Sequence, residues 1–280
     1  AIVAFDRCRE AAAFVAVERR ADEPMLPLTL FRNRTFTLSS GIALVVGIAM
    51  FGVIAFLPLF LQTVTGASAT DSGLLLAPLM GGMLASSILA GNLVTRTGRY
   101  RIFPILGTAI TGVGMYLLST LDAHTTMLQA GTYMVVCGIG LGLTMQIIVL
   151  ATQNAVPTTE LGVATSSVNF FRSIGGSLGV AFVGALFNSR FASMVDHPAP
   201  LDVDQIAALS APEKASYLEG FADALAGAFR FAVPLLVLGV VMALAMRELP
   251  LRTHALRAGT VHREPTDEDA EGVLLVGEPV

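Results

Sequence analysis

Between two long apolar runs the chain reads Gly91-Asn92-Leu93-Val94-Thr95-Arg96-Thr97-Gly98-Arg99-Tyr100-Arg101. The apolar runs extend from Leu74 to Val94 and from Ile102 to Leu121, so three arginines stand in a connection of only a few residues. Short connections that are rich in Arg or Lys stay on the cytoplasmic side of a membrane. This stretch therefore predicts two membrane-spanning helices joined by a cytoplasmic loop, and it sets the orientation of the other spans.

The composition is that of an integral membrane protein. Of the 280 residues, 54% are hydrophobic and only 14% are charged, whereas soluble domains have about 25% charged residues. The chain has no basic patch apart from loops that adjoin the spans, so we expect no binding of nucleic acid. The two cysteines, Cys8 and Cys137, form no disulfide framework, and Cys137 lies inside an apolar run.

Six transmembrane helices are predicted, each long enough to cross about 30 Å of hydrocarbon at roughly 1.5 Å per residue. They cover residues 37–61, 73–95, 102–121, 127–151, 164–188 and 230–247. Loops 62–72 and 122–126 contain no Arg or Lys and are assigned to the outside, opposite the arginine-rich loop. The fold class is therefore an all-α, six-helix integral membrane bundle with both termini in the cytoplasm.

Three segments lie outside the predicted spans. Residues 1–36 are expected to form a cytoplasmic lead-in, whose apolar stretch resembles the end of a truncated span. Residues 189–229 form a long outer loop, in which helical periodicity over residues 202–229 predicts helical structure at the membrane interface. Residues 248–280 are acidic and punctuated by Pro and Gly, which predicts a disordered cytoplasmic tail.

Arg172 is the ionisable residue that stands out, because it lies about eight residues, or roughly 12 Å, into the fifth span. Asn169, Arg172, Gly176 and Gly179 share one helical face, which is polar or small and should face into the bundle. Two interpretations stay open for Arg172. It belongs to a cavity wall or gate, or it extends toward the cytoplasm and binds carbonyl groups at a helix end.

The fourth span carries a second polar stripe, made of Gly138, Gly142, Gln146 and Gln153. The glycines suit close helix packing. We expect Gln146 at a cavity, because a buried amide in a membrane span needs hydrogen-bond partners. Phe56 of the first span either lines an apolar substrate path or simply faces lipid and neighbouring helices.

The stretch from Gly175 to Gly179 matches the hydrolase pattern G-x-S-x-G, but its serine is in the middle of a predicted span. That motif needs a strand-to-helix turn, and no His lies within a span to act as a base. We therefore predict that the protein is not an enzyme. The sequence has no metal-ligand cluster or P-loop, so no cofactor is expected. The Gly175-x-x-x-Gly179 spacing instead suits helix packing.

Residues 91–101 resemble the loop signature of the major facilitator superfamily, G-x-x-x-D-R-x-G-R-R. Four residues match it, namely Gly91, Arg96, Gly98 and Arg99. Thr95 stands where the family usually has Asp, and Tyr100 replaces a basic residue, so the loop lacks the carboxylate for the gate ion pair that the Asp would make. The resemblance implies a cytoplasmic gating loop made of Gly91, Thr95, Arg96, Gly98, Arg99 and Arg101.

Two further stretches narrow the resemblance to fourteen-span drug:proton antiporters. Residues 18–34 resemble the segment that enters the C-terminal bundle of those proteins, and residues 170–179 resemble their penultimate span. The resemblance covers residues 14–250. It implies that the chain is the C-terminal half of a major facilitator fold, in which substrate binds at the midplane between two six-helix halves.

The resemblance implies proton-coupled export of small, drug-like, amphipathic molecules across the cell membrane, and so multidrug efflux and antibiotic resistance. The expected partners are the lipid bilayer, the substrate, protons and an N-terminal six-helix half in the same or another chain. The candidate cavity residues are Arg172, Asn169, Gln146, Gln153 and Phe56. The alternatives are a non-transporting membrane remnant, a half-transporter subunit that requires a separate N-terminal half, and a metabolite uptake carrier.

Overall fold

The computed structural model describes residues 28–66, 73–194, 205–206 and 208–250, and every long element in these ranges is an α-helix. The long helices are α2 (Arg34–Thr65), α4 (Ala77–Thr97), α5 (Ile102–Leu118), α6 (Met127–Ala155), α7 (Leu161–Met194) and α9 (Ala211–Ala245). Two short 3-10 helices, η1 (Leu28–Arg32) and η2 (Thr158–Glu160), precede α2 and α7. The prediction of an all-α six-helix protein is confirmed.

Five of the helices are long and apolar enough to cross a membrane, namely α2, α4, α6, α7 (counted together with η2) and α9. The sixth, α5, is apolar but has only 17 residues. Most of the expected lead-in and most of the expected tail lie outside the described residues.

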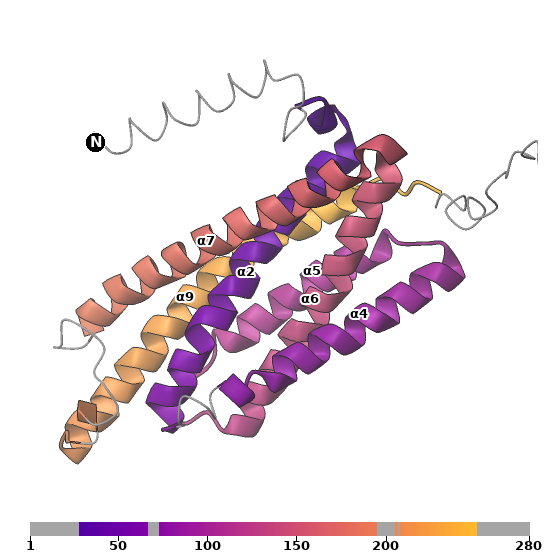
Figure 1. Ribbon diagram of the computed structural model, residues 1–280. Helices are drawn as coiled ribbons and strands as arrows, with labels where there is room; N and C mark the ends of the chain where they lie inside the picture. Colours follow the sequence, from indigo (N-terminus) through magenta and orange to yellow (C-terminus); the bar gives the residue numbers. More distant parts are fainter. Residues whose placement is uncertain (1–27, 67–72, 195–204, 207, 251–280) are drawn as a thin grey trace, which may run out of the picture. The chain divides into compact units, whose positions relative to one another are not determined.

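The helices of residues 28–249 pack side by side (Figure 1). α4 packs on α6, α5 packs on both α6 and α9, and α2 packs on α7 and α9. In Figure 1, α7 and α4 lie on opposite flanks of this arrangement. Each of these two helices therefore contacts neighbours on one side and leaves much of its opposite side uncovered.

Local sequence signals set several helix ends. Asn33 caps α2, since its side-chain oxygen accepts hydrogen bonds from the backbone N–H groups of Thr35 and Phe36. The Asn33 amide also donates to the carbonyl oxygen of Ala155 at 2.6 Å, which joins the start of α2 to the end of α6. α4 ends at Gly98, which has a φ of 69° that favours glycine.

Glycines allow the closest helix contacts. A Cβ added at any of four glycines would collide with a carbonyl oxygen of the neighbouring helix. The glycine–carbonyl pairs are Gly138 with Leu79, Gly142 with Met83, Gly175 with Leu44, and Gly179 with Ile48. The first two pairs join α6 to α4 and the last two join α7 to α2. The two glycine motifs identified in the sequence therefore serve helix packing, as predicted.

The structure differs from the predicted outer loop of residues 189–229. α7 continues to Met194, and residues 211–229 are the first half of the 35-residue helix α9. Helical structure is present here as predicted, and its apolar stripe packs against α7. The Phe187 and Phe221 rings are 5.1 Å apart, and the Phe191 and Tyr217 rings are 5.6 Å apart. Residues 195–204 and 207 lie outside the described residues.

The contact between α4 and α6 predicts unequal effects of the same substitution at two glycines. Gly142→Ala should lower the melting temperature of the detergent-solubilised protein, because the added methyl group must displace the Met83 backbone and the Ser86 hydroxyl. Overpacking of this kind costs about 1–3 kcal/mol. Gly81→Ala is the matched control, since a Cβ at Gly81 meets nothing within 4 Å. It should leave the melting temperature unchanged or raise it. Equal melting temperatures for the two variants would contradict the close contact.

Candidate functional site

Arg172 and Asn169 form a polar pair on α7. Both side chains are half-buried, and the Arg172 guanidinium donates a hydrogen bond to the Asn169 side-chain oxygen one turn earlier. The guanidinium also lies 3.9 Å from the Met145 sulfur on α6. Within the described ranges, Arg172 makes no hydrogen bond to a helix-end carbonyl. The arginine therefore lies where α6 and α7 meet.

The two glutamines of α6 differ in their surroundings. Gln153 is half-buried, and its amide donates to the Thr165 hydroxyl on α7 at 3.0 Å. Thr165 in turn donates to the Leu161 carbonyl oxygen at 2.8 Å, so this chain of bonds ties the end of α6 to the start of α7. Gln146 is exposed, and its amide has no hydrogen-bond partner among the described residues. Gln146 is next in sequence to Met145, the α6 residue that the Arg172 guanidinium contacts.

Phe56 lies away from this polar group. Its ring is half-buried on α2, 6.3 Å from the Phe187 ring of α7. Phe187 is fifteen positions after Arg172, which is about 22 Å along the helix at 1.5 Å per residue. The structure therefore joins Arg172 to Asn169 by a hydrogen bond, and Gln146 lies on the neighbouring helix, next in sequence to the Met145 that Arg172 contacts. It leaves Gln153 nearer one end of the helices and Phe56 nearer the other.

The predicted gating loop begins at the end of α4. The Gly98 N–H donates to the Val94 carbonyl oxygen at 2.9 Å and closes the helix. Thr95 donates its hydroxyl to the Asn92 carbonyl oxygen of the same helix at 2.9 Å. The Thr95 hydroxyl thus binds within its own helix, where the carboxylate of the family signature would make an ion pair. Arg96 and Arg99 are exposed.

The other end of the loop is held by the last residues of the bundle. Arg101 donates to the Leu244 carbonyl oxygen at the end of α9, with a distance of 2.6 Å. Tyr100 is fully buried, and its hydroxyl accepts a hydrogen bond from the Leu249 N–H at 3.0 Å. Asn154 of α6 donates to the Leu249 carbonyl oxygen at 3.3 Å. The loop is therefore attached to the ends of α6 and α9.

In the sequence, Tyr100 stands out only because the loop signature has a basic residue at this position. The sequence analysis did not predict that Tyr100 attaches the loop to the end of the bundle. The available signal was a large aromatic residue inside a short, otherwise polar loop. Such a residue has much apolar surface to bury when neighbouring helices can cover it. The Leu249 N–H that binds the Tyr100 hydroxyl is 149 positions away in the sequence, so the sequence did not indicate this partner.

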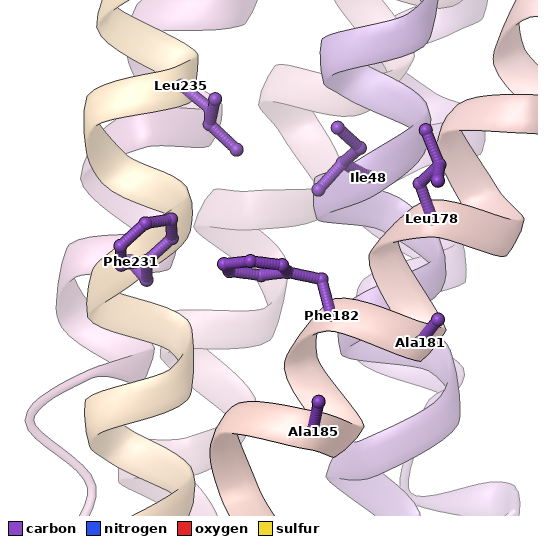
Figure 2. Close-up of a pocket in the computed structure, with 7 residues that line it drawn as sticks. All are labelled: Ile48, Leu178, Ala181, Phe182, Ala185, Phe231 and Leu235. Atoms are coloured by element: carbon purple, nitrogen blue, oxygen red, sulfur yellow. The ribbon is translucent and has the colours of Figure 1, made fainter. Parts of the chain in front are cut away.

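An apolar pocket of about 480 Å³ lies between α7, α9 and α2 (Figure 2). Its lining residues are Ile48, Leu178, Ala181, Phe182, Ala185, Phe231 and Leu235. Successive helical residues turn by about 100°, so around α7 Arg172 lies about 180° from Ala181, and Asn169 lies about 180° from Leu178. This pocket is therefore separate from the polar group that Arg172 forms.

The chain matches a known protein family over most of its length. The sequence model of the Major Facilitator Superfamily matches residues 2–180. An uncharacterized MFS-type transporter of Mycobacterium tuberculosis is 41% identical over 251 residues, which cover 85% of this chain and 36% of that protein. The multidrug transporter protein MdtP of Bacillus subtilis is 41% identical over 213 residues, covering 75% of this chain and 39% of that protein.

A tetracycline resistance determinant of Streptomyces rimosus is 37% identical, with 65% of this chain and 52% of that protein covered. Among solved structures, a bacterial homolog to the human lysosomal transporter Spinster, crystallised in an inward-facing and occupied conformation, has a TM-score of 0.60. It is 18% identical and the match covers 80% of this chain and 51% of that one, a likeness of fold. The chain spans 36–39% of the length of the first curated relatives that it matches.

The attachment of the loop predicts that the Tyr100 hydroxyl contributes to stability. Tyr100→Phe should lower the melting temperature of the solubilised protein, since the Leu249 N–H loses its acceptor. The loss of such a hydrogen bond costs about 0.5–1.5 kcal/mol. Tyr116→Phe is the matched control, because the Tyr116 side chain is 56% exposed. If both variants melt at the same temperature as the unmodified protein, the hydrogen bond contributes nothing to the attachment.

Proposed function

Because this chain belongs to the major facilitator superfamily, we propose that it forms one six-helix half of a transporter that exports drug-like small molecules. The observation that carries the proposal is the polar group of Arg172, Asn169 and Gln146 on otherwise apolar helices. Its relatives with assigned roles in multidrug transport and tetracycline resistance support export. The protein would be a multi-pass component of the cell membrane, with both termini in the cytoplasm.

The polar group needs a second wall. A charged or amide side chain that faced lipid would be costly, so such residues usually face a bundle interior or a water-filled cavity. Gln146 is exposed and Arg172 is only half-buried in the present half. In transporters of this class the substrate binds near the midplane between two repeats. A second six-helix half would therefore cover these side chains and enclose the substrate between the halves.

The polar group suits an amphipathic substrate. Arg172 and Gln146 offer hydrogen-bond donors to carbonyl or hydroxyl oxygens, while apolar neighbours such as Met145 and Phe171 accept hydrophobic parts. The predicted spans contain no Asp or Glu. If export is coupled to protons, the carboxylates that bind and release them would then come from the other half.

The arginine loop would act at the cytoplasmic side. Arg96 and Arg99 extend into solvent from a base that Tyr100 and Arg101 attach to α9. Because the adjoining residues are attached to α9, Arg96 and Arg99 are suited to pair with hydrogen-bond acceptors of the other half when the cytoplasmic side is closed. The loop would thus stabilise the outward-open state.

The proposed cavity role of Arg172 is tested by export of ethidium from energised cells that express the longest natural form of the protein. Arg172→Ala should lower the initial export rate about tenfold, which corresponds to roughly 1.4 kcal/mol. Arg230→Ala is the matched control, since Arg230 is exposed on α9 and away from the polar group. Unchanged export by the Arg172 variant would reject the cavity role. Net uptake of ethidium into the cells, or no transport of ethidium in either direction, would reject export.

The gating role of the loop is tested separately. Replacement of both Arg96 and Arg99 by Ala should reduce export severalfold while the amount of protein in the membrane stays the same. The reason is that both side chains are exposed, so their loss removes charge but no packing. Membrane fractions probed by blotting give the amount of protein, and ethidium efflux gives the activity. Full efflux in the double variant would show that the loop does not gate transport.

A further inference from the structure

The apolar pocket lies between α7, α9 and α2 (Figure 2). Phe182 of α7 and Phe231 of α9 face each other across it, with ring centroids 4.8 Å apart. They are 44% and 49% exposed, so the pocket is accessible from outside the six helices. Its lining is entirely aliphatic or aromatic. In a membrane, a pocket of this kind accepts a hydrocarbon chain.

A cationic side chain lies beyond the pocket, further along α7. Arg190 is five residues beyond Ala185 on α7, and its guanidinium lies directly against Gly227 of α9. A Cβ added at Gly227 would collide with that guanidinium. Gly227 precedes Phe231 by one helical turn, so the guanidinium crosses the groove between α7 and α9 just beyond the phenylalanine pair. The absence of a side chain at Gly227 makes room for this crossing.

Arg190 has charge to offer an external group. Its side chain is exposed, and among the described residues its guanidinium has no hydrogen-bond or ion-pair partner. Asp223 is exposed one turn before Gly227 and is the nearest carboxylate along that face of α9, but the structure records no ion pair between the two. Arg190 is also four residues from the end of α7 at Met194. That position corresponds to the level of lipid headgroups when the apolar part of α7 crosses the hydrocarbon.

The groove therefore combines two features of an amphiphile site, a chain-sized apolar pocket and a cation about one to two turns beyond it. We propose that this groove binds a phospholipid with an anionic headgroup. One acyl chain occupies the pocket against Phe182 and Phe231, and the headgroup phosphate region accepts hydrogen bonds from Arg190. If the groove bound lipids through apolar contacts alone, the Arg190 guanidinium beside Gly227 would have no ligand. This site does not depend on the proposed export.

The test compares two lipids that differ only in their headgroups, one anionic and one zwitterionic. The full natural protein is purified in a non-ionic detergent, and dioleoyl phosphatidylglycerol or dioleoyl phosphatidylcholine is titrated while native mass spectrometry counts bound lipid. Phosphatidylglycerol should bind about fivefold more tightly, which corresponds to roughly 1 kcal/mol for one arginine at a membrane surface. Arg190→Gln should reduce this preference to less than about twofold, and Arg190→Lys should keep most of it.

Three controls distinguish the groove between α7 and α9 from lipid binding elsewhere on the protein. Arg230→Gln removes an exposed arginine from α9, next to Phe231, and should leave the preference for phosphatidylglycerol intact. Asp223→Asn removes the nearest carboxylate and should leave the preference intact or increase it. Inorganic phosphate at the same concentration should not displace the lipid, since it has no acyl chain for the pocket. The melting temperature of each variant without added lipid establishes that it is folded.

The outcomes are decisive in both directions. A preference that depends on Arg190 but not on Arg230 supports the site. Equal binding of the two lipids to the unmodified protein would overturn it, as would an undiminished preference in folded Arg190→Gln. Ala181→Leu, which narrows the pocket without touching Arg190, should weaken the binding of both lipids. Unchanged binding by that variant would overturn the placement of the acyl chain.

Discussion

Close contact between the backbones of neighbouring helices is the constraint on which the rest of the structure depends. Lipid tails are as apolar as leucine side chains, so helices in a membrane gain little from burying apolar surface against one another. Glycines that let carbonyl groups approach replace that driving force. The Arg172 carbonyl itself lies against Gly47 of α2, and Gly175 follows Arg172 by one turn. These contacts hold one side of α7 on α2 and thereby turn the Arg172 side chain toward α6.

The sequence predicted the helices well because the apolar runs that can be recognised in it are also the residues that form the helices. Apolar runs interrupted by arginines indicate spans, and the spacing of Gly138 and Gly142 indicates a packing face. The sequence could not predict which part of the protein or membrane covers an apolar face of a helix. The stripe that includes Tyr217 and Phe221 has the same periodicity whether it lies on lipid headgroups or on α7. Only the position of α7, which depends on contacts distant in sequence, separates the two cases.

The candidate site shows the same limit. Gln146 and Gln153 are the same residue type, seven positions apart on one predicted stripe. In the structure Gln153 binds Thr165, whereas Gln146 remains exposed. A helical stripe gives the direction of a side chain, but its partner depends on where the next helix crosses. Phe56 was grouped with these residues by chemistry alone, and the structure separates it from them by several turns of helix.

The attachment of Tyr100 and Arg101 to the end of α9 has a mechanical consequence. Leu244 and Leu249 connect the α4–α5 loop to the last helix, and Asn154 adds α6 to the same junction. Four helices thus meet at one junction, and Pro234, which interrupts helical hydrogen bonding, lies inside α9 before Leu244. A bend of α9 at Pro234 would therefore move this junction together with Arg96 and Arg99.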